Sequence, residues 1–244
     1  MVEKVTTIHL DTIDSTNTYA KENYEQFEQD EITRITADEQ LKGRGRFKRE
    51  WLSPKGMNIY LTYYFTSNKN PMDLNNLAQI LCLSIAKLLN KEGLKPQIKW
   101  PNDVLVNQKK ISGILCETID LQGKFGVVLG TGININMPQK LLDSVDQPAT
   151  SLMTETGKEH NREALTKTLD KFFIDDYNLY KRDGFKPFYM SYDALLTHKG
   201  MPITLKQNSH TISGTLHSLN PDGRLNLLLP DGEIQTISSG EIKK

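Results

Sequence analysis

The chain has few of the features that mark secreted, membrane or disulfide-bonded proteins. Only two cysteines, Cys82 and Cys116, occur in 244 residues, and their spacing fits neither a disulfide framework nor a zinc motif. No apolar run approaches the roughly 20 residues that a membrane span requires. Residues 1–17 contain no apolar core of signal-peptide length. We therefore expect a cytoplasmic protein without a membrane anchor.

The chain also lacks net charge of one sign, because 30 Lys and Arg residues balance 30 Asp and Glu residues. A protein that coats nucleic acid broadly is usually basic, so a neutral total argues against that class. A chain of this length can bury a sizeable core without disulfide or metal staples. One large domain with a smaller one is the expected organisation.

Positive charge is nevertheless concentrated in one segment. Residues 42–49 carry five Lys and Arg side chains, interleaved with Gly43 and Gly45. Arginine forks match carboxylate and phosphate oxygens, and glycine lets the backbone approach a ligand closely. The segment lacks the Gly-Lys-Ser/Thr ending of a Walker loop, and Lys48 stands where a dinucleotide fingerprint has its third glycine. The pattern predicts either a site for a small anion or a solvated basic loop that contacts nucleic acid.

Hydrophobic patterning divides the chain into an α+β part and a smaller all-β part. Alternating or β-branched segments predict strands at residues 5–10, 32–37, 57–65, 97–100, 104–106, 110–118 and 126–136. Helical spacing predicts helices at residues 16–27, at 74–89 with Asp73 as its N-cap, and at 162 to about 183. Because several strands follow one another directly, we expect a mixed or antiparallel sheet. Short strands at 203–206, 211–216, 225–229 and 234–237, separated in part by Pro-Asp-Gly turns, predict a small β-barrel. The predicted domains are residues 1–196 and 197–244.

Three other segments offer polar groups to a ligand. Lys110 opens an apolar strand, so its ammonium either points into a pocket or lies exposed with Lys109 in a hairpin. Asn134 and Asn136 share a strand face, where they either bind a nucleotide or close the strand end. Residues 14–17, Asp-Ser-Thr-Asn, either cap a helix or bind a polar ligand at its N-terminus. The sequence shows no nucleophile elbow and no histidines at metal-ligand spacing, so nucleophilic and zinc catalysis have no support.

The order and spacing of these segments resemble the biotin protein ligases over essentially the whole chain. The matching segments are residues 14–17, 40–46, 51–54, 99–103 (Lys-Trp-Pro-Asn-Asp), 110–115, 130–134, 149–152 and 240–242. The resemblance implies an α+β catalytic domain of the class II synthetase-like type, followed by an SH3-like barrel. Some family members carry a DNA-binding helix-turn-helix ahead of this signature. Only thirteen residues precede it here, so we expect the monofunctional type with no DNA-binding domain.

The resemblance implies a two-step ligation. Biotin and ATP give biotinyl-5′-adenylate and pyrophosphate, and a lysine on the biotin carboxyl carrier protein of acetyl-CoA carboxylase then attacks the mixed anhydride and releases AMP. ATP would enter with Mg²⁺, for which no motif of the protein supplies ligands. A homodimer is compatible with the resemblance.

Residue roles follow from the resemblance, position by position. The implied biotin-binding residues are Ser15, Thr16, Asn17, Gln40, Arg44, Gly45, Arg46, Lys110 and Gly113, with Thr16 on the ureido ring. The implied ATP- and adenylate-binding residues are Arg44, Arg46, Trp51, Asn102, Lys110 and Asn134. Adenylation brings two anions together, so Lys110, Arg44 and Arg46 are the expected catalytic groups. The chain departs from the family after Arg46, where Phe47-Lys48-Arg49-Glu50 replaces a basic-glycine-basic run, which predicts a stiffer loop.

Two other functions remain open from the sequence. A lipoate–protein ligase shares the catalytic fold, but this chain has no counterpart of its Arg-Arg…Gly-Gly-Gly run. A nucleic-acid-binding module would use residues 42–49 and the barrel, but the neutral charge and the lack of an evident aromatic stacking platform weigh against it.

Overall fold

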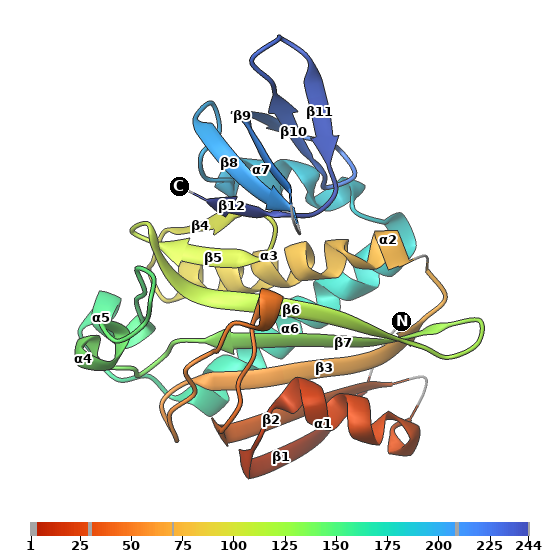
Figure 1. Ribbon diagram of the computed structural model, residues 1–244. Helices are drawn as coiled ribbons and strands as arrows, with labels where there is room; N and C mark the ends of the chain where they lie inside the picture. The colour runs from red at the N-terminus through yellow and green to blue at the C-terminus, as the bar shows by residue number, and fades with distance from the viewer. Residues whose placement is uncertain (1–3, 29–30, 70, 208–209, 244) are drawn as a thin grey trace.

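Seven strands form one mixed sheet in the order β1-β2-β3-β7-β6-β5-β4 (Figure 1). The computed structural model describes residues 4–28, 31–69, 71–207 and 210–243. The strands are β1 (Val5–Ile13), β2 (Ile32–Gln40), β3 (Ile59–Ser67), β4 (Pro96–Lys99), β5 (Asp103–Val106), β6 (Lys109–Asp120) and β7 (Phe125–Ile133). β1 and β2 pair in parallel, and the other neighbours pair antiparallel. The mixed sheet expected from the sequence is therefore confirmed.

Strand β3 is buried on both faces, because helices cover the sheet from both sides. Successive side chains of a strand point to opposite faces. Leu61, Tyr63 and Phe65 join the core under α3 (Asn76–Lys91) and α6 (Arg162–Asp183), whereas Tyr64 packs with Ala20 of α1 (Thr16–Asn23). Figure 1 shows α1 on the near face of the sheet and α3 and α6 behind it.

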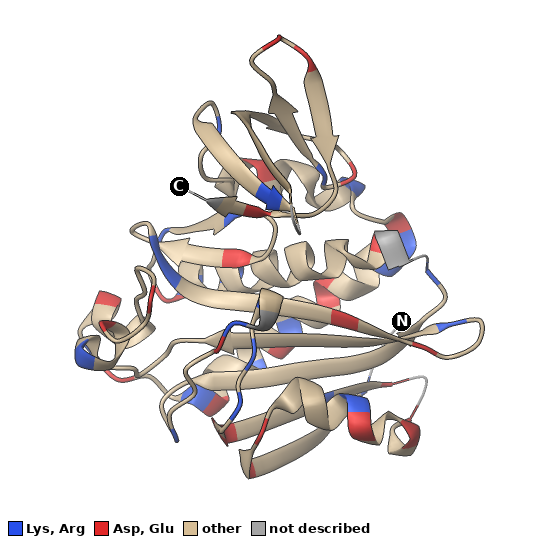
Figure 2. Cartoon of the chain, in the orientation of Figure 1, with Lys and Arg blue, Asp and Glu red and all other residues tan. Residues whose placement is uncertain are grey.

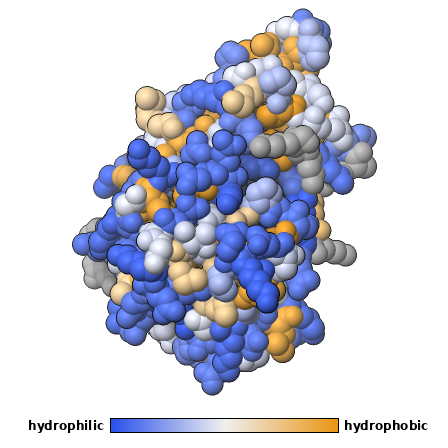
Figure 3. Space-filling model, turned by 90° about the vertical axis from the view of Figure 1, so that its left-hand side faces the viewer, coloured by the Kyte–Doolittle hydropathy of each residue, from blue (hydrophilic) through white to orange (hydrophobic). Residues whose placement is uncertain are grey.

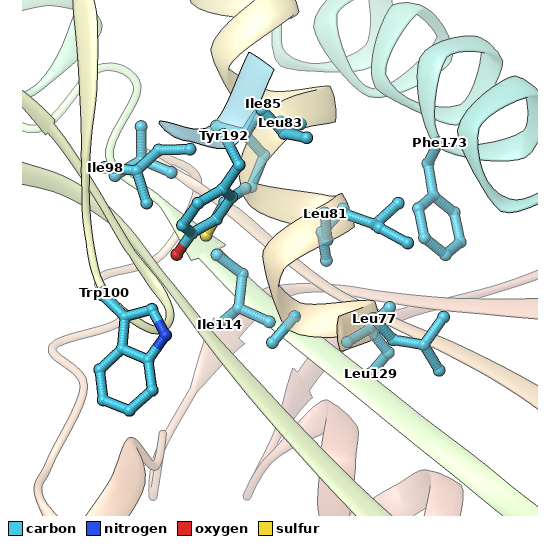
Figure 4. Packing of buried hydrophobic residues seen from close by; sticks show 14 of the residues in the cluster. Leu77, Leu81, Leu83, Ile85, Ile98, Trp100, Ile114, Leu129, Phe173 and Tyr192 are labelled. Atoms are coloured by element: carbon cyan, nitrogen blue, oxygen red, sulfur yellow. The ribbon is translucent and has the colours of Figure 1, made fainter. Parts of the chain in front are cut away.

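Helix α3 is the centre of the main core, as its periodicity predicts. Leu77, Leu81 and Ile85 are fully buried, and Figure 4 shows Leu81 pointing toward Phe173 of α6. The predicted cap is wrong, because α3 begins at Asn76 with Asn75 as its N-cap, and Asp73 lies in the separate turn α2 (Pro71–Leu74). Proline favours the first position of a helix, so Pro71 starts a turn of its own.

Several short elements escape the sequence patterns. The predicted helix at residues 16–27 stops at Asn23 and continues as a 3₁₀ turn, η1 (Tyr24–Gln26). The predicted strand at residues 126–136 ends at Ile133. The helical elements without a prediction, besides α2, are α4 (Gln139–Leu142), α5 (Leu152–Thr156), α7 (Tyr189–Leu195), η2 (Arg46–Lys48) and η3 (Lys186–Phe188). These elements have three to seven residues, which is too few turns to show a helical period.

The C-terminal strands form a second, antiparallel sheet in the order β11-β10-β9-β8-β12. They are β8 (Pro202–Gln207), β9 (His210–Leu219), β10 (Leu225–Leu228), β11 (Ile234–Ile237) and β12 (Glu241–Lys243). The turn before β10 is fixed to the larger part, since the carbonyl of Gly223 accepts hydrogen bonds from Trp100 Nε1 at 3.1 Å and Gln79 Nε2 at 2.8 Å. This places the small sheet over α3 and β4, as Figure 1 shows.

Helix α6 offers a direct test of local capping. The side chain of Asn161 accepts a hydrogen bond from the backbone N–H of Ala164 at 3.0 Å, and α6 spans the residues predicted for it. Replacing such a cap with alanine leaves that N–H without its partner. Asn161→Ala is expected to lower the free energy of unfolding by about 1 kcal/mol. Urea unfolding of both proteins measures it, and an unchanged midpoint would contradict the capping role.

Within the described residues, no helix is long and apolar enough to cross a bilayer. Figure 3 views the molecule from the side that carries α4 and α5 in Figure 1. On that face hydrophilic side chains dominate and hydrophobic ones are scattered in small groups.

Candidate active site

A pocket of about 430 Å³ opens on the face of the sheet that carries α1. It gathers segments that lie far apart in the sequence: the start of α1, the end of β2, the basic loop, the first half of β6 and the end of β7. The residues implied by the resemblance that line it are Ser15, Thr16, Asn17, Gln40, Arg44, Gly45, Arg46, Trp51, Asn102, Lys110 and Gly113. Asn134 is the implied residue that does not line it.

The first turn of α1 forms the floor of the pocket. Ser15 occupies the N-cap position, but its side chain makes no capping hydrogen bond, so the capping interpretation of residues 14–17 is wrong. Ser15, Thr16 and Asn17 are instead buried. Gln40, at the end of β2, accepts hydrogen bonds through Oε1 from the backbone N–H and the hydroxyl of Thr16, at 2.9 and 3.2 Å.

Glycines on β6 and β7 make the room that the pocket needs. A Cβ on Gly130 would lie 1.9 Å from Asn17 Oδ1, and a Cβ on Gly132 would lie 2.1 Å from Trp51 Nε1. A Cβ on Gly113 would meet the Lys110 side chain at 3.0 Å. The indole of Trp51 therefore lies directly on the backbone of β7. Its buried Nε1 is without a hydrogen-bond partner among the residues that the structure describes.

Lys110 reaches the pocket because β6 is irregular at its start. The register with β5 shifts between Val104 and Leu105, so Ile111 is an extra residue in β6. Such a bulge brings Lys110 and Gly113 to the same face, which regular alternation would place on opposite faces. Lys110 Nζ lies 2.8 Å from Asp103 Oδ1 and 5.3 Å from the centre of the Trp51 ring. The exposed-hairpin interpretation holds for Lys109 but not for Lys110, whose side chain is 16% exposed.

The basic loop folds into a small hairpin that lines the pocket, and Figure 2 shows its Lys and Arg positions in blue, in front of the larger sheet. Arg44 and Glu50 form a β-bridge, and the N–H of Gly45 donates to the carbonyl of Arg49 at 2.8 Å. Phe47 turns the tip with φ 56° and leaves its ring half-exposed. A residue with a side chain therefore takes up the left-handed conformation at this tip.

Each arginine of the loop has a fixed partner. Arg44 Nη2 donates to Thr18 Oγ1 at 3.1 Å and lies 3.7 Å from the carboxylate of Glu117. Arg46 Nη1 donates to Asn102 Oδ1 at 3.0 Å and to the carbonyl of Gly240 at 3.1 Å. Burial lowers the pKa of Arg46, although an arginine remains charged at neutral pH.

Arg49 links the same loop to the C-terminal sheet. Its guanidinium lies 2.6 Å from Glu241 Oε1, at the start of β12. Together with the contact between Arg46 and Gly240, this ion pair holds the loop between the two sheets. A loop so positioned can place two guanidiniums around an anion that enters the pocket.

The two asparagines beyond β7 serve the backbone. Asn134 Nδ2 donates to the carbonyl of Thr150 at 3.0 Å. Asn136 exchanges two hydrogen bonds of 2.9 Å with the backbone of His160. In the described structure both side chains therefore secure the chain after the strand end.

The remaining titratable groups give little support for thiol or metal chemistry. Burial raises the pKa of Cys82 well above its usual value and that of the partly buried Cys116 to about 12, so neither is a thiolate near neutral pH. His9, Asp11 and Asp38 lie close enough to hold a cation, but none of them lines the pocket, and Asp38 already pairs with Arg162 at 3.0 Å.

Sequence reasoning missed several residues that support the site. Thr62 lies beneath Thr16 and Asn17, Ser53 beneath Gln40, and Glu117 beside Asn17. Thr62 is the one polar residue in the run Ile-Tyr-Leu-Thr-Tyr-Tyr-Phe, which is a signal that the sequence offers. Asp103 and Glu241 belong to segments singled out by the resemblance, but their partners, Lys110 and Arg49, follow only from the fold.

Comparison with known proteins gives matches over both parts of the chain. Residues 10–134 match the model of the "Biotin/lipoate A/B protein ligase family", and residues 198–244 match the "Biotin protein ligase C terminal domain". The bifunctional ligase/repressor BirA of Escherichia coli is 30% identical over 238 residues, which are 96% of this chain and 72% of that protein. The biotin–[acetyl-CoA-carboxylase] ligase of Paracoccus denitrificans is 28% identical and covers 85% of this chain and 88% of its own.

A solved structure agrees with these matches. Biotin protein ligase from Aquifex aeolicus, in complex with biotin and ATP, superposes with a TM-score of 0.80 at 31% identity. The superposition covers 98% of this chain and 97% of the other.

Proposed function

This chain belongs to the biotin/lipoate A/B protein ligase family, and on that premise we propose that its pocket is the active site of a biotin protein ligase. The enzyme activates the carboxylate of biotin with ATP, releasing pyrophosphate, and holds the resulting biotinyl-5′-adenylate. A lysine amine of a carrier domain then attacks the acyl carbon, forms the amide and releases AMP. We divide the chain into a catalytic domain, residues 1–196, and a C-terminal domain, residues 197–244, which contains the small sheet.

The observation that carries this proposal is the gathering of three cationic side chains at one pocket. Arg44, Arg46 and Lys110 come from separate segments and line the same cavity. Biotin carboxylate and ATP are both anions, so their reaction needs this positive charge to offset the repulsion. Lys110 has the position to contact the carboxylate and the α-phosphate, and the two arginines fold over the anhydride.

The other residues then take distinct roles. We assign Ser15, Thr16, Asn17 and Gln40 to contacts with the biotin ring. Gly113 has no side chain, and we propose that this lets the ligand lie close to β6. Trp51 and Asn102 serve the adenylate side of the pocket. Asn134 is assigned to the same side and acts through the backbone that it secures. Excluding water from the anhydride is the task of the hairpin loop at residues 42–51.

Substrates and setting follow from the same premise. ATP enters as MgATP, in which the cation travels with the phosphates. The acceptor is the biotin carrier protein of acetyl-CoA carboxylase, as the name of the Paracoccus relative indicates for that enzyme. We place the reaction in the cytoplasm, in keeping with two free cysteines and no disulfide among the described residues. A homodimer stays a prediction.

The two alternatives are separable. The family includes lipoate ligases, so exchange of labelled pyrophosphate into ATP should be followed with biotin and with lipoate. Exchange that depends on biotin and not on lipoate is expected, and the reverse would overturn the proposal. The nucleic-acid alternative depends on a basic patch that is free to contact phosphates. The loop arginines instead contact Thr18, Asn102 and Glu241 around the pocket, which argues against this alternative.

The ion pair between the loop and the small sheet yields a further prediction. Glu241→Gln removes the charge that holds Arg49, and a partly exposed pair contributes up to about 1 kcal/mol. The rate of adenylate formation is expected to fall about two- to fivefold, while the dissociation constant for biotin alone stays unchanged. Glu233→Gln, on an exposed residue of the turn between β10 and β11, is the control. Equal rates for Glu241→Gln and the native chain would show that the pair does not position the loop.

A further inference from the structure

We propose that two hydrogen-bond relays beneath the pocket fix Thr16 as a hydrogen-bond acceptor, and that this polarity selects a ligand ring bearing an N–H group. The inference rests on the proposed function and deepens it. It assigns positioning roles to Thr62, Ser53 and Glu117, none of which lines the pocket. Each relay ends on a group that can only accept, so its direction is set.

The first relay begins at the carboxylate of Glu117. Asn17 Nδ2 donates both of its protons, to Glu117 Oε2 at 3.0 Å and to the carbonyl of Leu115 at 3.3 Å. Asn17 Oδ1 is thereby left facing Thr62 as an acceptor, and Thr62 Oγ1 donates to it at 2.6 Å. Thr62 also lies 2.8 Å from Thr16 Oγ1. Thr62 has one proton, which it gives either to Asn17 or to Thr16, and in both cases a lone pair of Thr16 stays free for a ligand.

The charge of Glu117 keeps that relay directed. Burial disfavours its ionised form, but hydrogen bonds from Lys21 and Asn17 outweigh burial and lower the pKa of Glu117. Lys21 Nζ lies 2.8 Å from Glu117 Oε1. An ionised carboxylate has no proton to donate, so the orientation of the Asn17 amide cannot reverse.

The second relay begins at the backbone carbonyl of Trp51. Ser53 Oγ donates to that carbonyl at 2.9 Å and accepts from Gln40 Nε2 at 3.1 Å. The amide of Gln40 is therefore oriented with Oε1 toward Thr16, where it accepts from both the N–H and the hydroxyl. The hydroxyl proton of Thr16 is drawn away from the pocket, and its oxygen faces a ligand as an acceptor.

A hydrogen-bond acceptor at Thr16 discriminates between the ring of biotin and the ring of lipoate. The cyclic urea of biotin carries two N–H donors, one of which can satisfy Thr16. The dithiolane ring of lipoate has only carbon, hydrogen and sulfur and offers no such donor. Covering Thr16 with that ring would leave a buried acceptor unsatisfied, which costs about 1–3 kcal/mol.

The test removes each relay at one hydroxyl. Thr62→Val and Ser53→Ala are each expected to raise the dissociation constant for biotin, measured by calorimetry without ATP, about three- to tenfold. In the double variant the dissociation constant for biotin should rise about 10- to 100-fold. The KM for ATP and the kcat at saturating biotin should stay within about twofold of the native values, since both relays end on Thr16, at the site proposed for the biotin ring.

Two further variants separate positioning from general damage. Thr62→Ser keeps the hydroxyl and should restore native biotin affinity. Tyr63→Phe removes a buried hydroxyl at the next position of β3, where it bonds Asp170 at 2.7 Å on the opposite face of the sheet. It should lower thermal stability and leave biotin affinity unchanged.

The relays are refuted if the single and double variants bind biotin within about twofold of the native chain, or if Tyr63→Phe weakens binding as much as Thr62→Val. Failure of the proposed function looks different. In that case the native chain itself neither binds biotin nor forms the adenylate.

Discussion

Lys110→Ala is expected to lower the rate of biotinyl adenylate formation by about 10²–10³ while the chain stays folded. The ammonium of Lys110 lies at the pocket wall, 2.8 Å from Asp103 and against the face of Trp51. In the proposed function it is the cation that meets both the biotin carboxylate and the α-phosphate. Removing one preorganised charge from such a site typically costs 10²–10³ in rate, or about 3–4 kcal/mol at about 1.4 kcal/mol per tenfold.

Pyrophosphate exchange at saturating biotin measures this effect, and a thermal unfolding curve verifies the fold. Lys109→Ala is the matched control, because Lys109 is the neighbouring lysine of the same hairpin and its side chain is exposed. The control should exchange at the native rate. Near-native exchange by Lys110→Ala would remove the catalytic role assigned to this residue.

Gly132→Ala is the second change with a large expected effect. The added Cβ would lie 2.1 Å from Trp51 Nε1, so the indole must leave its place on β7. Trp51 is also the aromatic face beside Lys110, and its displacement disturbs the side of the pocket that we propose for the adenylate. A misplacement of about 1 Å in an active site can cost 10²-fold, and we expect a loss of about that size.

A double-mutant comparison shows whether Gly132→Ala acts through Trp51. In a Trp51→Ala background the added methyl has no indole to displace, so Gly132→Ala should cost little more than Trp51→Ala alone. If the loss of rate in the double variant equals the product of the losses in the two single variants, Gly132→Ala acts independently of Trp51. The proposed stacking of Trp51 on β7 would then have no functional consequence.

Much of the fold follows from patterns that the chain repeats several times. Helices α3 and α6 have four or more turns of apolar spacing, and their interiors were predicted correctly. The ends were harder, because α2 takes Asp73 out of the expected cap and β7 stops before Asn134. The bulge at Ile111 leaves no pattern in the sequence, yet it decides that Lys110 faces the pocket.

The sequence predicted most of the residues that line the pocket, but not the contacts that hold those residues in place. The residues implied by the family resemblance do line one cavity, Asn134 excepted. Thr62, Ser53 and Glu117 touch those residues from below, through contacts between positions 13 to 100 residues apart. Such contacts depend on strand register, and no local spacing encodes them. The link from Arg49 to Glu241 spans 192 residues and depends on how the small sheet docks.

The central claim is that this pocket joins biotin to a carrier lysine at the expense of ATP. Its most direct test is the mass of a biotin carrier domain of acetyl-CoA carboxylase after incubation with the native chain, biotin and MgATP. The account predicts a gain of one biotinyl group on one lysine, and no gain when ATP or biotin is omitted or when Lys110→Ala replaces the native chain. A carrier of unchanged mass, beside a biotin ligase control that modifies it, would contradict the account.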